Sequence, residues 1–168
     1  LEQLPATLQR LAQFLLRFGQ LLQGFLGPFR IKLAQSPLQL GQALAPFVHA
    51  MMDVSDGLLI DARRLTSASE VAIAIDIDCV PISRDYLALS GDEKTARLSA
   101  ATSGDDYELL FTAPPKQSDR IFGIGRSLGL AITPIGRVAS GAGLTLIDRA
   151  GPLPLPDRLG YEHGGKPG

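Results

Sequence analysis

The chain has 168 residues, enough for one domain with a full core but too few for two comfortable ones. Sixteen basic and seventeen acidic side chains give a formal net charge of −1, so no overall basic field supports nucleic-acid binding. The single cysteine, Cys79, excludes an internal disulfide and fits a reducing, cytoplasmic compartment. Histidine occurs only at positions 49 and 163, which leaves no His/Cys cluster for a zinc site.

The chain begins at Leu1, and its only methionines are Met51 and Met52. A natural start supplies methionine, so we expect this sequence to be a piece of a longer protein or a processed product. The expectation bears on function, because a partner half of any active site would then lie outside this chain.

The first 37 residues predict a helix and a connector. Between residues 4 and 26 the apolar side chains alternate in spacings of four and three, which places them on one stripe of an amphipathic helix. The polar face is mostly glutamine, which favours docking on protein over lying on a membrane surface. No apolar run reaches the ~20 residues of a membrane-spanning helix, so we expect no membrane partner. Residues 28–37 are interpreted as a connector, and residues 1–37 together could be a remnant of a preceding domain.

Residues 38–163 mix predicted helices and strands without strict alternation. The patterns indicate helices at 38–48, 57–69, 84–101 and 116–128, and strands at 50–54, 71–78, 109–112, 131–138 and 143–148. This mixture favours one α+β domain, a mixed β-sheet packed with helices, over residues 38–163. Residues 164–168 are expected to form a flexible tail.

Residues 53–57, Asp-Val-Ser-Asp-Gly, stand at the junction between a predicted strand and a predicted helix. Helix N-termini favour anions, yet carboxylates placed there repel a phosphate unless a divalent cation sits between them. The junction therefore suggests a Mg²⁺–phosphate site. The alternative is structural: Ser55 or Asp56 is simply an N-cap and Asp53 a solvated residue at the strand end.

A second acidic cluster, Gly104-Asp105-Asp106-Tyr107-Glu108, directly precedes the predicted strand at 109–112. Taken with the junction, it completes an ordered set of motifs. The chain resembles the C-terminal half of the thiamine-monophosphate kinase family, part of the superfamily that includes aminoimidazole-ribonucleotide synthetase. Four stretches carry the resemblance: 53–69, 75–83, 103–112, and 135–146 with 160–163.

The resemblance implies a synthetase-related C-terminal domain, preceded here by the amphipathic helix. It implies ATP-dependent phosphorylation of thiamine monophosphate to thiamine diphosphate with Mg²⁺, in a full-length protein expected to be a homodimer. Asp56 would be the catalytic residue beside Mg²⁺ and the ATP phosphates, with Ser55 next to it. Asp53 would be a second metal ligand. Asp105, Asp106 and Tyr107 would line the substrate side or brace the junction.

The chain also departs from the family pattern. The acidic motifs of the family's N-terminal half are not recognisable in residues 1–27, so we expect this chain alone to be inactive. Glu70 stands where a helix-ending glycine is usual, and a left-handed conformation there would cost on the order of 1 kcal/mol. No aromatic residue follows His163.

Two alternatives stay open. The chain could be a stand-alone, non-catalytic domain that uses the helix at 4–26 for binding or dimerisation, since such an apolar stripe needs a cover. It could also belong to another ATP-dependent enzyme of the same superfamily, acting on a different small phosphorylated or carboxylated substrate.

Overall fold

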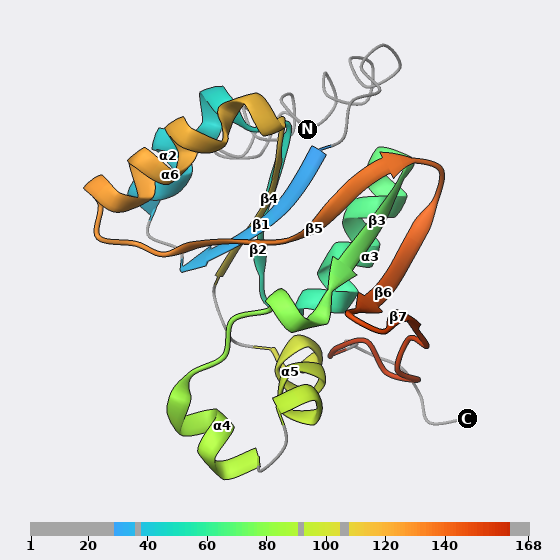
Figure 1. The fold of residues 1–168 in the computed structure, drawn as a ribbon. Helices are drawn as coiled ribbons and strands as arrows, with labels where there is room; N and C mark the ends of the chain where they lie inside the picture. Colours follow the sequence, from blue (N-terminus) through green and yellow to red (C-terminus); the bar gives the residue numbers. More distant parts are fainter. Residues whose placement is uncertain (1–28, 36–37, 91–92, 105–107, 162–168) are drawn as a thin grey trace, which may run out of the picture.

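The structure, a computed structural model, describes residues 29–35, 38–90, 93–104 and 108–161. The described strands form one seven-stranded sheet in the order β2-β4-β1-β5-β3-β6-β7 (Figure 1). Neighbouring strands are antiparallel except for β3 and β6, which are parallel. The strands are β1 Phe29–Gln35, β2 Ala50–Val54, β3 Val71–Asp76, β4 Glu108–Ala113, β5 Ile132–Ser140, β6 Gly143–Asp148 and β7 Gly151–Leu153.

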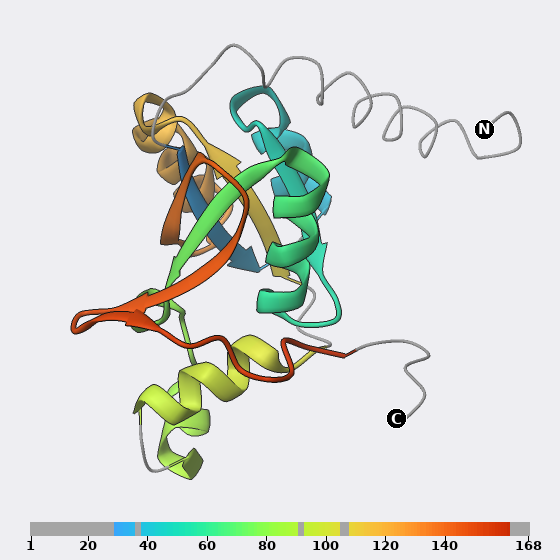
Figure 2. The same ribbon diagram turned by 90° about the vertical axis from the view of Figure 1, so that its right-hand side faces the viewer.

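The helices cover both faces of the sheet. Helices α2 and α6 lie side by side on one face, α3 lies on the other, and α4 and α5 stand together at one end of the molecule (Figures 1 and 2). Their bounds are α2 Leu38–Leu44, α3 Leu58–Ser69, α4 Arg84–Ser90, α5 Glu93–Thr102 and α6 Ser118–Ser127. The predicted α+β architecture with a mixed sheet is confirmed.

The connector predicted at residues 28–37 is wrong. Residues 29–35 form β1, which pairs with β4 on one side and with β5 on the other. The sequence Phe-Arg-Ile-Lys-Leu alternates apolar and polar residues as strands do. The flanking Pro28 and Pro37 are typical of a connector, and the segment is nevertheless a strand. A boundary at residue 38 would cut through this sheet. The helix predicted at 4–26 and the tail at 164–168 lie outside the described residues.

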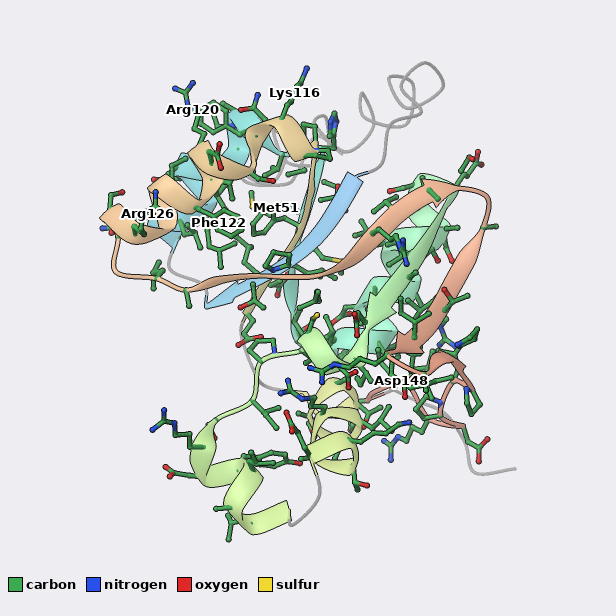
Figure 3. The ribbon with its side chains drawn as sticks, in the orientation of Figure 1. Met51, Lys116, Arg120, Phe122, Arg126 and Asp148 are labelled. Atoms are coloured by element: carbon green, nitrogen blue, oxygen red, sulfur yellow. The ribbon has the colours of Figure 1, made fainter. Side chains whose placement is uncertain are left out.

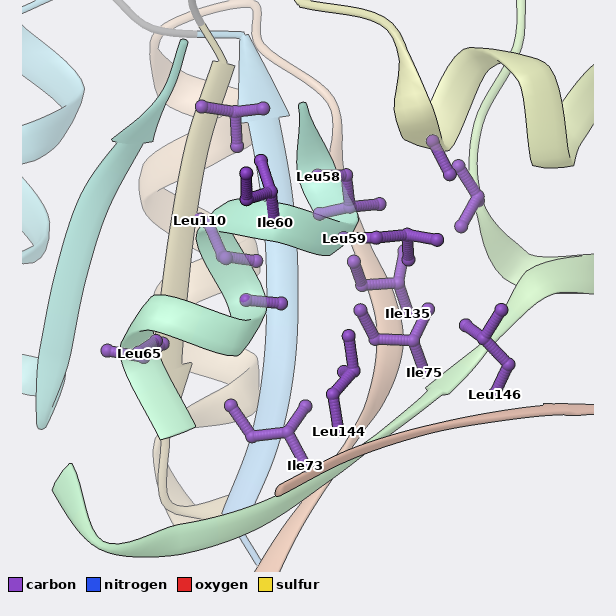
Figure 4. Close-up of a cluster of buried hydrophobic side chains, with 14 of the residues drawn as sticks. Leu58, Leu59, Ile60, Leu65, Ile73, Ile75, Leu110, Ile135, Leu144 and Leu146 are labelled. Atoms are coloured by element: carbon purple, nitrogen blue, oxygen red, sulfur yellow. The ribbon is translucent and has the colours of Figure 1, made fainter. Parts of the chain in front are cut away.

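The main core lies between α3 and the sheet. Leu58, Leu59 and Leu65 of α3 pack against Ile73 and Ile75 of β3 and against side chains of the neighbouring strands (Figure 4). These side chains are at most 8% exposed. Because the apolar stripe of α3 faces this core, packing of Leu58, Leu59 and Leu65 fixes the helix on the sheet.

A second core lies on the opposite face of the sheet. Leu109 and Phe111 of β4 contact Leu40 and Leu44 of α2 and Ile121 of α6. Successive strand residues point to opposite faces, so Leu110 joins the first core instead. Strand β4 is therefore buried on both sides.

Helix α6 also carries a cation–π contact at its surface. The Arg120 guanidinium carbon lies 4.3 Å from the centre of the Phe47 ring. Figure 3 labels Arg120 on the outer side of α6.

Most predicted elements are confirmed, with two refinements. The helix predicted at 84–101 is divided into α4 and α5, and Gly151–Leu153 forms β7 where only a turn and a Pro/Gly-rich tail were expected. Glu70 does adopt the left-handed conformation at the end of α3, with φ 52° and ψ 44°. Within the described part of the chain, no helix has the length and apolar character needed to cross a membrane.

Candidate functional site

The junction between β2 and α3 is built around a glycine. Gly57 is the N-cap of α3 and has φ 129°, a conformation that side chains rarely adopt. No side chain caps the helix at this position, so the simple N-cap interpretation of Ser55 or Asp56 is wrong. The loop 55–56 must therefore be held by other contacts.

Asp61, one turn into α3, holds that loop. Its carboxylate is completely buried, and Oδ2 accepts hydrogen bonds from the backbone N–H groups of Ser55 at 3.0 Å and Asp56 at 3.2 Å. A buried carboxylate that accepts several hydrogen bonds is stable only where its charge is also compensated. The loop is thus fixed by the helix that it precedes.

Arg64 supplies the compensating charge. Its Nη1 donates to Asp61 Oδ1 at 2.6 Å and to Asp56 Oδ2 at 2.5 Å. The hydrogen bonds to Asp56 and then to Asp61 raise the pKa of Arg64 above its ordinary value. One guanidinium thus bridges the buried carboxylate and the side chain of Asp56, which is 14% exposed.

Two segments that are distant in the sequence pack against this corner, by which we mean the loop 55–56 together with Asp61 and Arg64. A Cβ added at Gly104 would lie 2.7 Å from the carbonyl oxygen of Ser55, and one at Gly160 would lie 2.5 Å from that of Asp56. Tyr161 N–H donates to the same Asp56 carbonyl at 2.7 Å. The start of the second acidic cluster therefore lies against the first motif, and residues 159–161 cover it.

The predicted site residues fall into three groups. Ser55 and Asp56 share the loop that Asp61 anchors, with Ser55 exposed. Asp53 is exposed near the end of β2, which is an edge strand of the sheet. Asp105, Asp106 and Tyr107 lie outside the described residues. Gly104 and Glu108, which flank them, both adjoin the junction: Glu108 pairs with Val54 in the β2–β4 ladder.

A cavity of about 470 Å³ opens next to this corner. Its volume is in the range of small-molecule sites. It is mainly apolar, with Glu108 as its acidic residue. The lining residues are Val54, Leu58, Val80, Pro81, Ile82, Ser83, Tyr86, Ala100, Ala101, Ser103 and Glu108.

The far wall of the cavity, α4 and α5, is joined to the sheet by long side chains. Arg97 of α5 donates to the Val80 carbonyl and pairs with Glu93 at 2.5 Å. Lys94 of α5 pairs with Asp148 at the end of β6 at 2.6 Å; Figure 3 labels Asp148. Val80, together with Ala100 and Ala101 of α5, is among the residues that line the cavity, so the Arg97–Val80 hydrogen bond joins two parts of its wall.

The corner offers oxygen ligands to a hard cation. Mg²⁺ is usually held by one or two carboxylates together with substrate phosphates. Among the described residues, no three His, Cys, Asp or Glu side chains gather closely enough to form a complete metal site. The carboxylates of Asp56 and Asp53 are the candidates at this corner for a site that phosphate oxygens would complete.

Sequence reasoning missed two residues of this corner. Asp61 and Arg64 have the i, i+3 spacing of helix neighbours, which predicts an ion pair. That spacing does not reveal that Asp61 turns back to the loop or that Arg64 reaches Asp56. Gly160 lies in the last motif stretch, 160–163, and its close approach to Asp56 joins positions about 100 residues apart, which no local pattern reveals.

Comparison with known proteins gives a consistent result. The model of the family "AIR synthase related protein, C-terminal domain" matches residues 30–149. That match begins within β1, so it includes the strand that sequence patterns missed.

Individual relatives share this region. The chain is 34% identical to the thiamine-monophosphate kinase of Escherichia coli K12 over 128 residues, which are 76% of this chain and 39% of that protein. The thiamine-monophosphate kinase structure from Stenotrophomonas maltophilia K279a superimposes with a TM-score of 0.63 at 31% identity, over 73% of this chain and 50% of that one. The structure of AaThiL complexed with AMPPCP and TMP has the same fold, with a TM-score of 0.57 at 23% identity. The superposition covers 83% of this chain and 52% of that one. The chain spans only 30–39% of the length of the first three curated relatives it matches.

Proposed function

Because the chain belongs to the AIR synthase related C-terminal domain family, we propose that it is the C-terminal part of an ATP-dependent thiamine-monophosphate kinase. The product would be thiamine diphosphate. The observation that carries the proposal is the corner where Ser55 and Asp56 are fixed by buried Asp61 and enclosed by Gly104 and Gly160. The names of the matched relatives support the same reaction.

The corner suits phosphoryl transfer, which needs alignment of two anions and cancellation of charge more than covalent chemistry. Asp56 and Asp53 would hold Mg²⁺, which when bound neutralises phosphate charge. Ser55 would contact the nucleotide phosphates from the exposed side of the loop. Asp61 keeps the loop from shifting, so that the backbone that carries Asp56 is already in place when the metal binds.

The adjoining cavity suits the organic part of the acceptor. Thiamine carries a positively charged thiazolium ring, and an apolar cavity with one carboxylate attracts such a cation while packing against its rings. Glu108 is the acidic lining residue, and Tyr86 adds an aromatic wall. Asp105, Asp106 and Tyr107 would lie on this substrate side.

The whole enzyme would need more than this chain. We infer an N-terminal half that supplies further Mg²⁺ and nucleotide ligands, a homodimer in the complete protein and a cytoplasmic location. The corner described here would form one wall of the active site.

An assay of thiamine diphosphate formation tests the proposal. The full-length protein should convert thiamine monophosphate with ATP and Mg²⁺, and residues 1–168 alone should show negligible turnover. Robust turnover by the isolated chain would reject the proposal that an N-terminal half supplies the other wall of the active site. Absence of turnover by the full-length protein, with turnover on another phosphate acceptor, would reject the substrate.

A further inference from the structure

A single nitrogen atom lies between the two carboxylates of the corner. Nη1 of Arg64 is 2.5 Å from Asp56 Oδ2 and 2.6 Å from Asp61 Oδ1. A point between two anions is where a cation is most strongly attracted. The guanidinium thus takes up negative charge that Asp56 would otherwise offer to another cation.

The three members of this cluster differ in their freedom to move. Asp61 is fully buried, and its second oxygen is occupied by two backbone N–H groups. Arg64 is 46% exposed, whereas Asp56 is 14% exposed. The link between Arg64 and Asp56 is therefore the one that can open toward solvent while Asp61 keeps the loop in place.

We propose that Arg64 is an internal counter-cation that competes with a divalent metal for Asp56. The inference rests on the proposed function, in which Asp56 is a metal ligand. When metal binds, the guanidinium leaves Asp56 and stays on Asp61, so Arg64 sets the Mg²⁺ concentration that the enzyme requires. Arg64 acts through Asp56 and is a positioning residue in this role.

Metal affinity separates this role from a structural one. An arginine that only stabilised the fold would alter the melting temperature and leave metal binding unchanged. A competing cation has the opposite signature: its removal should tighten metal binding even where the protein becomes less stable. The sign of the change in affinity is therefore the decisive observation.

The experiment measures Mn²⁺ binding to the full-length protein by electron paramagnetic resonance, with a saturating non-hydrolysable ATP analogue that supplies the phosphate oxygens of the shared site. We expect Arg64→Met to lower the Kd for Mn²⁺ by about three- to ten-fold, as loss of one nearby, partly solvated charge implies. Arg64→Lys keeps the charge and should stay within about two-fold of wild type. Arg63→Met removes an equal charge from the next residue, which is also exposed, and serves as the matched control.

A second pair of variants guards against misfolding, because Arg64→Met leaves Asp61 buried without its partner. The double variant Asp61→Asn with Arg64→Met should bind Mn²⁺ more tightly than Asp61→Asn alone. Unchanged or weaker binding in the folded variants that lack Arg64 would overturn the proposal.

The variant Asp56→Asn distinguishes failure of the role given to Arg64 from failure of the metal assignment of Asp56. If it abolishes Mn²⁺ binding while loss of Arg64 has no effect, only the role of Arg64 is rejected. If it leaves Mn²⁺ binding unchanged, the metal assignment of Asp56 fails and the role of Arg64 fails with it.

Discussion

The acidic corner and the wall of the neighbouring cavity are held in place in different ways. At the corner, backbone segments are in direct contact. Gly104 and Gly160 approach the backbone of Ser55 and Asp56 so closely that neither glycine could carry a side chain without a clash. At the wall, Ala101 of α5 packs in the main core. The extended side chains of Lys94 and Arg97 add links to Asp148 at the end of β6 and to the Val80 carbonyl. The corner therefore has no room for an added side-chain atom, whereas the charged links at the wall can be removed without a steric clash.

This difference matches what each region is proposed to do. Phosphoryl transfer loses rate when the reacting groups are misplaced by small distances. A cavity for an organic ring system tolerates adjustment, because packing and one charge give most of its affinity. We therefore expect substitutions at the corner to affect folding and chemistry together, and substitutions at the cavity to affect substrate affinity or local stability alone.

The largest effect is expected for Gly160→Ala at the corner. The added Cβ would lie 2.4 Å from Ile60 Cγ2 and 2.5 Å from the Asp56 carbonyl oxygen, so the backbone itself must move. Strain of this kind should lower the free energy of unfolding by about 3 kcal/mol or more. Urea denaturation measures the change.

Gly41→Ala is the matched control for that substitution. In helix α2 its Cβ would meet only the Met51 side chain at 3.8 Å, which is ordinary contact. Alanine also favours helix over glycine by up to about 1 kcal/mol. If Gly160→Ala were as well tolerated as this control, the corner would not be as tightly enclosed as described.

Asp61→Ala should have the next largest effect. It leaves the N–H groups of Ser55 and Asp56 without their acceptor and Arg64 without its buried partner. We expect a loss of about 2–3 kcal/mol in unfolding free energy. Asp61→Asn, which keeps one acceptor oxygen, should lose less, and equal losses for the two variants would argue against the hydrogen-bonded loop.

Glu108→Gln tests the cavity without disturbing its shape. Removing the lining carboxylate should raise the KM for thiamine monophosphate about ten-fold in the full-length enzyme, the equivalent of ~1.4 kcal/mol of attraction to a cation. The Mg²⁺ dependence should stay the same, because the metal is assigned to the other region. If Glu108→Gln changed the Mg²⁺ dependence and left the KM for thiamine monophosphate unaltered, the assignment of metal to the corner and of substrate to the cavity would be contradicted.

The smallest effect is expected for Asp148→Asn, at the tether of α5. The hydrogen bond from Lys94, followed by those from Ala150 and Gly151, holds the pKa of Asp148 below its ordinary value. A lowered pKa adds stability above the unfolded-state value of about 3.9, and this stability is lost as pH falls through the folded-state value. Wild type should therefore melt slightly above the variant at pH 5–8, and the difference should shrink below pH ~4.

Added salt provides a check on that difference. The Lys94 ammonium is 47% exposed, so screening should reduce the stability gap between wild type and Asp148→Asn. A gap that grew as pH fell below ~4 would contradict the assigned direction of the pKa shift.

Local patterns in the sequence were sufficient for much of the fold. Strand β3, helix α3 and the left-handed Glu70 follow from alternation, helical periodicity and the missing glycine. Strand β1 was missed because its pattern is short and flanked by prolines, and its identity depends on pairing with residues 108–113 and 132–138. Local signals cannot report pairing over such separations.

The candidate site divides along the same line. The junction at 53–57 could be identified from carboxylates and a glycine within five residues. The anchoring by Asp61, the bridge by Arg64 and the cover by Gly160 depend on how the loop folds back and on a segment about 100 residues away. The residue types at 53–57 were enough to predict the position of the site. The contacts that hold this loop in place are visible only in the tertiary structure.

The central claim is that Asp56 belongs to a metal–phosphate site. The most direct test is a Mg²⁺ titration of thiamine diphosphate formation by the full-length protein and its Asp56→Asn variant. The account predicts that the variant loses at least about a hundred-fold in turnover, as removal of a group that organises charge at the reacting phosphates implies. Unchanged turnover with an unchanged Mg²⁺ requirement would contradict it.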